Sequence, residues 1–527
     1  MGEEVIKTIL ELEDIQKIQP DFSQLKIINK ETAERIQVLI FAKENTTLQI
    51  LTTNNFTKSL NKILSTLEEK GFKHQEHYTS IEGFNFALTR YDKLEEERAQ
   101  TQKDIKEQRQ AGGKSAIEMI RKLFDTRSTM DPGQFITEVI RLSFQTGASD
   151  LHFQPELDKV EMLIRIDGVI QKIVEFTIDD FEKYLQKIMF LSGAKLNVDY
   201  IPQDGRFSFE AIDLEGKTRQ IDARVSLIPS LKLPSTVIRF LDATMGIKGF
   251  EEIGFSGRNY DTLKRNILKN TGVTIFTGPT GSGKSTTLYS ILNYLNNGEK
   301  KIITLEDPVE YQIAGIQQSQ INSAKGYTYE LGLKAILRHD PDIILIGEIR
   351  SKETAEIGIN AALTGHLVFT TLHTNSAIEG ISRLINMGVK LYMIAPSVNL
   401  IVGQRLVRRV CPHCNIKIEA SYGEKEEIME SVKRINESNA GMNLEFDGRT
   451  TQAVGCEKCN KTGYIGRITV VEAFEITEDI KRAIIEGKST LDLYAIARQA
   501  GYLTLKEDGI IRVLNGETTM DEIRRVL

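Results

Sequence analysis

Three observations predict an α/β protein with several domains. The chain has 527 residues, which is too long for a single hydrophobic core. From about residue 246, the short apolar runs VTIFT, KIITL, DIILIG and HLVFTTL alternate with helical segments, a rhythm typical of a mostly parallel sheet covered by helices. Four cysteines stand in two CxxC pairs in the last third of the chain, and this pattern favours a bound metal over disulfides.

The composition is that of a soluble globular protein, with 40% hydrophobic and 27% charged residues. The net charge of -6 argues against a non-specific nucleic-acid binder. No run approaches the roughly eighteen apolar residues that a membrane-spanning helix needs. The first residues, MGEEVIKTILELEDIQ, lack the basic region of a secretory signal. Any membrane role is therefore expected to come through a partner protein.

The first part of the chain predicts a small α/β domain over residues 1–90. Gln37–Ala42 is strand-like, and Phe56–Gly71 carries leucines and isoleucines at helical spacing. Residues 91–115 are charged and polar and predict a linker. No catalytic constellation stands out in this part, so an adaptor role is expected for the domain.

Residues 116–243 predict a second domain of helices and alternating strands. An apolar helical stripe at Ile136, Val139 and Ile140 precedes runs that alternate like sheet strands, among them VEMLIRIDGVIQKIV and QIDARVSLIPS. The parallel-sheet domain is expected over 246–410, the cysteine module over 411–470, and a helical region over 471–527.

The strongest local signal is a phosphate-binding loop between an apolar strand and a helix. The segment GPTGSGKS matches the pattern GxxxxGK[ST] at every fixed position. Its glycines permit the backbone N–H groups to surround a phosphate, and the N-terminus of the following helix adds positive potential. Lys284 is expected to reach the β- and γ-phosphates of ATP, and Ser285 to hold Mg²⁺. The expected binding residues are Gly278, Pro279, Thr280, Gly281, Ser282, Gly283, Lys284, Ser285 and Thr286.

Two carboxylates follow the next apolar strands and are expected near the γ-phosphate. Glu310 lies in TLEDPVE after KIITL, and Glu348 follows the strand DIILIG. Ligand sites of parallel sheets lie outside the carboxyl ends of the strands. One carboxylate can position Mg²⁺ while the other orients or activates the attacking water. Gly347 stands where a common Walker B motif has its aspartate, which leaves Glu348 to serve the metal. The alternative is that both are solvated carboxylates at strand ends.

Two histidines flank the strand LVFTTL. His366 precedes it and His373 follows it. A nucleotide-sensing role is plausible for both, although a lone histidine is usually structural.

The cysteines predict a closed structural zinc site. Two CxxC turns can complete a tetrahedron of four sulfurs, and the candidate ligands are Cys411, Cys414, Cys456 and Cys459. His413 is an alternative ligand, but four cysteines suffice. The long gap between the pairs predicts an inserted lobe.

Together, the run from GPTGSGKSTTLYS through TLEDPVEY and GEIR to TGHLVFTTLHTN resembles the secretion ATPase superfamily. The resemblance extends upstream to GASDLHF, RIDG and QDGR, and downstream to QRL, the cysteines and the tail, so that it covers residues 116–527. It implies a RecA-like C-terminal domain preceded by a PAS-like α+β domain. It also implies a homohexameric ring that hydrolyses ATP.

The resemblance also implies roles for particular residues. Glu310 is the family's usual general base and Glu348 fills the Walker B role, although the residues by themselves leave that assignment open. Arginines of the PAS-like domain reach the phosphates in this family, and the matching residues are Arg206, Arg224 and Arg239. Such cations stabilise charge in phosphoryl transfer. The alternative is that they pair with surface carboxylates.

Four functions remain to be compared. The resemblance favours a motor for type IV pilus assembly, acting at the cytoplasmic face of the inner membrane through a membrane platform protein. A type II secretion ATPase is the alternative, because the motor motifs are shared. A RecA-like nucleic-acid motor is the candidate from another class, and the acidic charge argues against it. A non-hydrolysing scaffold is disfavoured by the intact Lys284, Glu310 and Glu348.

Overall fold

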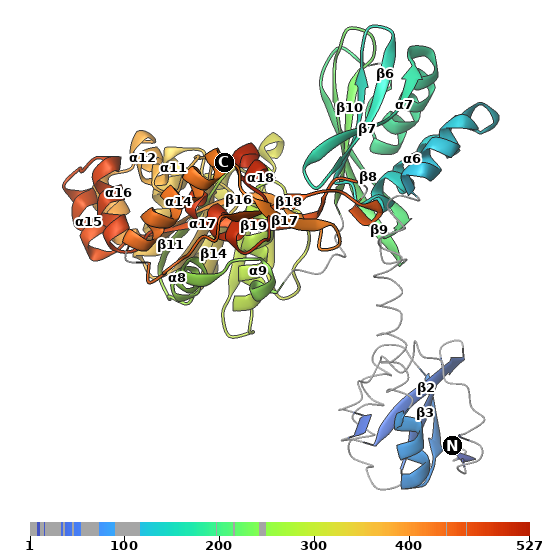
Figure 1. Cartoon of the computed structure of the whole chain (residues 1–527). Helices are drawn as coiled ribbons and strands as arrows, with labels where there is room; N and C mark the ends of the chain where they lie inside the picture. Colours follow the sequence, from blue (N-terminus) through green and yellow to red (C-terminus); the bar gives the residue numbers. More distant parts are fainter. Residues whose placement is uncertain are drawn as a thin grey trace. The chain divides into compact units, whose positions relative to one another are not determined.

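The computed structural model of the chain forms two compact units, Met1–Gln108 and Arg109–Leu527 (Figure 1). It describes residues 8–10, 15, 33–34, 37–44, 47–53, 73–89, 116–196, 198–213, 217–241, 249–438, 440–459 and 461–527. The helix expected at 56–71 and the linker expected at 91–115 lie outside the described residues.

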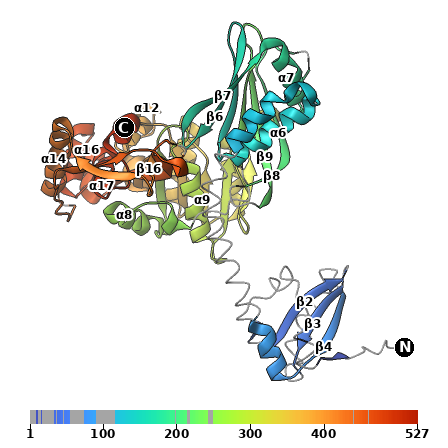
Figure 2. The same cartoon turned by 45° about the vertical axis from the view of Figure 1, so that its right-hand side comes forward.

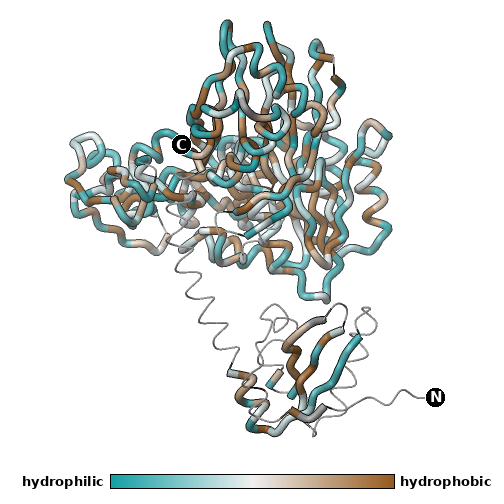
Figure 3. Tube along the Cα trace, turned by 90° about the vertical axis from the view of Figure 1, so that its right-hand side faces the viewer, coloured by the Kyte–Doolittle hydropathy of each residue, from teal (hydrophilic) through white to brown (hydrophobic). Residues whose placement is uncertain are grey.

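The first unit contains a four-stranded mixed sheet in the order β1-β4-β3-β2. Its strands are β1 (Thr8–Ile9), β2 (Val38–Glu44), β3 (Thr47–Thr52) and β4 (Lys73–Tyr78). The strand expected at 37–42 falls on β2. Figure 3 shows hydrophobic strands beside a hydrophilic one, which corresponds to the sequence KHQEHY of β4. Leu39, Ile50 and Phe84 are buried in the core of the unit.

The second unit begins with a six-stranded antiparallel sheet in the order β7-β6-β5-β10-β9-β8. Its strands are β5 (Asp150–Pro155), β6 (Lys159–Ile166), β7 (Val169–Thr177), β8 (Gln203–Ile212), β9 (Thr218–Ile228) and β10 (Ser235–Leu241). Its helices are η1 (Arg127–Thr129), α6 (Pro132–Gln145) and α7 (Ile178–Ser192), and residues 116–125 are also helical. Figure 2 shows α6 and α7 along one face of the sheet.

Alternating burial explains the two faces of this sheet. In β9 every second residue from Ile221 to Leu227 is buried, and these residues join an aromatic core with Phe135, Phe153 and Phe176. Helix α6 begins at Pro132, after Asp131 caps it by accepting the Gln134 N–H at 3.0 Å, and its expected stripe is buried. The opposite face of the sheet is left for polar residues.

A seven-stranded sheet follows in the order β13-β12-β14-β15-β11-β16-β19, parallel except for the last pair. Its strands are β11 (Gly272–Thr277), β12 (Ile302–Glu306), β13 (Gln317–Gln320), β14 (Ile343–Ile346), β15 (Leu367–Leu372), β16 (Val398–Val410) and β19 (Tyr464–Glu475). Its helices are η2 (Phe250–Glu252), α8 (Gly257–Ile267), α9 (Lys284–Leu295), η3 (Ser323–Lys325), α10 (Tyr329–Ile336), η4 (Leu337–His339), α11 (Lys352–Leu363), α12 (Glu379–Asn386) and α13 (Leu391–Ser397).

Helices cover both faces of this sheet (Figure 1). One core joins the strands to α8 and α9, and another joins them to α10–α13 and the C-terminal helices. The central strands β11, β12, β14 and β15 are buried along their whole lengths, which is why they read as unbroken apolar runs. This confirms the expected α/β architecture.

The C-terminal part adds a two-stranded sheet and several helices. They are β17 (Asn415–Glu419), α14 (Tyr422–Glu437), β18 (Arg449–Ala453), η5 (Glu457–Cys459), α15 (Glu478–Ile485), α16 (Thr490–Gln499), α17 (Leu505–Leu514) and α18 (Met520–Val526). The boundary expected at 470 falls inside β19, because β19 pairs with β16 as the edge strand of the seven-stranded sheet. The cysteine lobe is thus an insertion between two strands of that sheet.

Candidate functional site

The phosphate loop lies at the carboxyl end of β11 and leads into α9. Gly278 and Gly283 have φ angles of 146° and 88°, in the region that favours glycine. A Cβ on Gly278 would lie 2.6 Å from the Gln404 carbonyl oxygen, and one on Gly283 would lie 2.9 Å from Gln404 Nε2. Both glycines are therefore required by conformation and by the close approach of β16.

Lys284, at the first position of α9, points back into the phosphate loop. Its Nζ donates to the carbonyl oxygens of Gly278 at 2.7 Å and of Pro279 at 3.0 Å. Burial, with a smaller contribution from Arg405, lowers the pKa of Lys284 to about 8, and Glu348 opposes the shift. Thr280, Ser285 and Thr286 are exposed. An anion in the loop would replace the two carbonyl oxygens as the partner of the ammonium group.

Two glutamates at the end of β12 and in the loop after it, Glu306 and Glu310, have different surroundings. Glu306 is buried and accepts hydrogen bonds from the hydroxyl groups of Tyr289 and Thr304 and from Gln318. Glu310 is partly exposed, and its backbone N–H donates to the Tyr289 hydroxyl at 3.2 Å. Tyr289 thus fixes this loop from α9. The sequence analysis did not single out Tyr289 or Glu306. Glu306 could have been found, because a carboxylate at the end of a buried apolar strand needs hydrogen-bond donors around it.

Glu348 follows β14 and contacts two basic side chains. Its carboxylate forms an ion pair with Arg350 and lies 3.4 Å from His373 Nε2, and its side chain is 13% exposed. A Cβ on Gly347 would lie 3.0 Å from the Tyr329 hydroxyl and 3.3 Å from the Leu305 carbonyl oxygen. Glycine stands at the position of the common aspartate because there is little room for a side chain.

The two histidines lie at opposite ends of β15. His373 is at the carboxyl end and contacts Glu348. His366 is at the other end, where its Nδ1 lies 2.8 Å from the Ala361 carbonyl oxygen. Because β15 runs parallel to β11, the structure does not bring His366 to the phosphate loop of its own chain.

The candidate arginines form a row across the six-stranded sheet. Arg206 of β8 and Arg239 of β10 both pair in register with Arg224 of β9, so the three side chains share one face. Arg239 Nε donates to the Asp150 carboxylate at 2.8 Å. Burial raises the pKa of the Asp150 carboxyl, but the hydrogen bonds from Arg239 and Ser149 outweigh this effect and hold the pKa below its usual range.

Arg224 connects this row to the loop after β12. Its Nη1 lies 3.0 Å from Glu310 Oε2, and its Nη2 donates to the Val309 carbonyl oxygen at 3.2 Å. A second contact between the two sheets joins the Asp167 carboxylate to the Gly466 N–H at 2.9 Å. Arg206 is exposed, and its expected phosphate contact stays a prediction.

A pocket of about 490 Å³ opens beside the phosphate loop. Its lining includes Gly278, Pro279, His373, Asn375, Glu379 and Arg383. The pocket therefore lies at the carboxyl edge of the sheet, between the start of the phosphate loop and the segment that carries His373.

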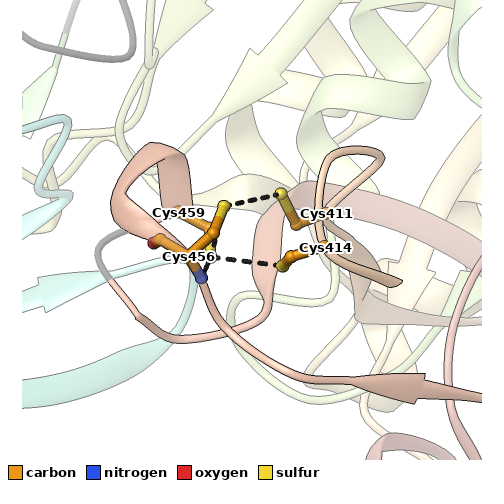
Figure 4. Close-up of side chains that lie close together, drawn as sticks. All are labelled: Cys411, Cys414, Cys456 and Cys459. Atoms are coloured by element: carbon orange, nitrogen blue, oxygen red, sulfur yellow. Dashed lines mark hydrogen bonds between the residues drawn. The ribbon is translucent and has the colours of Figure 1, made fainter. Parts of the chain in front are cut away.

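The four cysteine sulfurs lie within 4.8 Å of one another (Figure 4). The Sγ–Sγ distances are 3.9 Å for Cys411–Cys456 and 3.8 Å for Cys414–Cys459 and Cys456–Cys459. A tetrahedron with Zn–S bonds of about 2.3 Å has edges of about 3.8 Å, whereas a disulfide needs about 2.05 Å between its sulfurs. The residues therefore fit a zinc ion.

Backbone groups support a thiolate at this cluster. Burial raises the pKa of the Cys459 thiol, but the N–H groups of Cys456 and Gly463 help to lower it to about 7. These groups donate to Cys459 Sγ at 3.1 and 3.2 Å.

We expect the purified protein to contain about one zinc ion per chain, because a closed set of four cysteines is a structural zinc site. Elemental analysis of protein purified without added zinc measures this. A chelator should release the ion, free four titratable thiols and lower the melting temperature. A folded protein with no metal and four free thiols would reject the site.

Comparisons with known proteins agree with this geometry. A model of the family described as type II/IV secretion system protein matches residues 131–525. The chain is 39% identical over 393 residues to the type IV pilus assembly ATPase PilB of Thermus thermophilus. That alignment covers 74% of this chain but 42% of the relative, so the chain spans less than half of that protein's length.

Two further relatives are secretion proteins. Type II secretion system protein HxcR of Pseudomonas aeruginosa is 36% identical over 78% of this chain and 80% of its own length. Type II secretion system protein E of Aeromonas hydrophila is 36% identical over 75% of each chain. Among solved structures, the Legionella pneumophila ATPase DotB is similar with a TM-score of 0.53 at 19% identity, covering 74% of this chain and 94% of DotB. The last similarity concerns the fold alone.

Proposed function

The chain is an ATP-hydrolysing enzyme of the type II/IV secretion system protein family, and we propose that it is the assembly motor of a type IV pilus. The contact of Arg224 with Glu310 carries the motor function, and the similarity to the PilB protein supports the choice of pilus assembly. The contact supports a nucleotide site built from both sheets of the larger unit, in which hydrolysis can be coupled to movement between them.

In this proposal the phosphate loop and Lys284 bind the phosphates of ATP. Ser285 and Glu348 hold Mg²⁺, which when bound neutralises phosphate charge. Glu348 is already oriented by Arg350 and His373, and the exposed Ser285 hydroxyl is free to turn to a ligand.

Glu310 is the proposed general base. Its carboxylate is paired with the Arg224 guanidinium. A phosphate near Arg224 would compete for the guanidinium and free the carboxylate to accept a proton from water. Arg239 and Arg206 would add positive charge from the same row.

The proposal extends to a homohexameric ring and to a membrane partner. A ring motor passes force to its partner through moving domains, and the two-sheet nucleotide site suits that task. Of the helices that the structure describes, none combines the length and the apolar character that crossing a bilayer requires. We place the protein at the cytoplasmic face of the inner membrane, bound to a platform protein. For the hexamer, light scattering of the purified protein should give about six times the chain mass of 59.4 kDa.

The nearest alternative is the ATPase of a type II secretion system. It is supported by relatives of similar identity that carry that name. A nucleic-acid motor is disfavoured by the net charge of -6.

A gene deletion in the source organism separates these functions. We expect the deletion strain to lack surface filaments in electron micrographs, while its export of secreted proteins is unchanged. The wild-type gene should restore the filaments, and the gene carrying Lys284→Ala should not. Intact filaments together with lost export would replace pilus assembly by type II secretion. Normal filaments and normal export would contradict both functions.

A further inference from the structure

A buried polar cluster on β16 and β19 lies directly behind the phosphate loop. Gln404 and Arg405 are consecutive residues of β16, exposed by 1% and 9% of their surfaces, and Glu472 of β19 is exposed by 2%. Burying two charges and an amide is costly unless each is paired. None of the three has a role in the proposed hydrolysis, so their cost calls for another explanation.

Gln404 holds the phosphate loop. Its Nε2 donates to the Ser282 carbonyl oxygen at 2.9 Å, within the loop itself. Its backbone carbonyl oxygen is the atom that a Cβ on Gly278 would approach to 2.6 Å. The loop is therefore seated on β16 at its first glycine and at Ser282.

Arg405 connects that seat to the segment after His373. Its Nη1 donates to the Gln404 carbonyl oxygen at 3.0 Å, and its Nη2 donates to the Asn375 carbonyl oxygen at 2.9 Å. One planar guanidinium thus spans both carbonyl groups, which a flexible ammonium group cannot do in the same way. This fork therefore connects Asn375 to β16, the strand on which the phosphate loop is seated.

Glu472 of β19 holds the segment after His373. Its Oε1 accepts the Ala377 N–H, and its Oε2 accepts the Tyr502 hydroxyl at 2.7 Å and the Leu505 N–H at 3.1 Å. Burial raises the pKa of the Glu472 carboxyl, and these hydrogen bonds and the nearby Arg405 guanidinium oppose that shift. Gly403 makes this possible, because a Cβ there would lie 2.5 Å from Glu472 Oε1.

We propose that Gln404 and Arg405 are positioning residues that hold the phosphate loop and residues 373–377 as one rigid unit, with Glu472 as its anchor. The segment carries His373, which contacts Glu348, so the unit fixes the two sides of the nucleotide site relative to each other. The inference rests on the proposed phosphate site and adds residues that act through others.

Arg405→Met should weaken ADP binding and lower kcat, each by about tenfold, the scale of a hydrogen bond made by a charged donor. Gln404→Met should weaken ADP binding severalfold, because the side chain of Gln404 holds Ser282 of the phosphate loop. Calorimetry with ADP, steady-state ATPase kinetics and melting temperature are measured for each variant.

Arg408→Met is the matched control on the same strand. Arg408 lies three residues after Arg405 on β16 and pairs with Glu522 at 2.8 Å, and Arg525 remains to pair with that carboxylate. It should lower the melting temperature and leave ADP affinity and kcat within about twofold of wild type.

Arg405→Lys keeps the charge beside Glu472 and should preserve folding if Arg405→Met does not. It should still weaken ADP binding severalfold, because an ammonium group lacks the fork. If wild type binds ADP and both Arg405 variants bind it equally well, losing only melting temperature as Arg408→Met does, the inference is overturned. If wild type binds no ADP, the proposed phosphate site is overturned and the inference with it.

Discussion

Lys284→Ala should reduce ATP turnover by roughly a hundredfold or more, the scale of losing a preorganised charge at a phosphoryl-transfer site. The ammonium group is held at the loop by the carbonyl oxygens of Gly278 and Pro279, so that it already lies where a phosphate would bind. Phosphate release from purified protein at saturating ATP measures the effect, and the melting temperature establishes that the variant folds.

Lys352→Ala is the matched control, because Lys352 occupies the first position of α11 as Lys284 does in α9. Its side chain is exposed and pairs with Glu356 on the same helix, a contact of little energetic weight. Turnover should stay at the wild-type rate. A Lys284→Ala variant with full activity would remove the phosphate loop from the mechanism.

Glu310→Gln should leave nucleotide binding nearly intact and slow hydrolysis by about a hundredfold, which corresponds to about 2.7 kcal/mol in the activation free energy. The amide keeps the size of the side chain but cannot accept a proton from water. Binding is measured with labelled ATP, and the chemical step is measured in a single turnover.

Glu356→Gln, a surface change on α11, serves as the control and should behave as wild type. A Glu310→Gln variant with normal single-turnover rates would transfer the role of base to Glu348, the other carboxylate at this edge of the sheet. It would also mean that the ion pair with Arg224 is a contact between domains without a part in hydrolysis.

Much of the fold could be predicted because the central strands are buried on both faces. Such strands are unbroken apolar runs, and the four that were expected in this sheet are β11, β12, β14 and β15. The edge strand β19 was harder to place. The first four residues of β19, Tyr464–Arg467, are exposed or half-buried, so the sequence there looks like part of the cysteine lobe.

The site was predictable where its residues are neighbours in the chain. The glycine conformations and the position of Lys284 follow from a short contiguous motif, and the two CxxC turns place their sulfurs by local geometry. The sequence did not show which of His366 and His373 lies at the phosphate loop. Both flank one strand, and only the direction of β15 beside β11 decides which of them lies at the phosphate loop.

The sequence by itself determined the α/β class, the phosphate loop and the four cysteines, because each depends on local periodicity or on spacing within a few residues. Tertiary structure alone decided that Arg224 meets Glu310 and that Gln404 and Arg405 support the phosphate loop. Most of these contacts join residues that are 85 or more positions apart in the sequence. The exception is the contact between Arg405 and Asn375, which are 30 positions apart. Strand order and register set such contacts, and both are properties of the packed sheets, which bury their apolar faces in one arrangement.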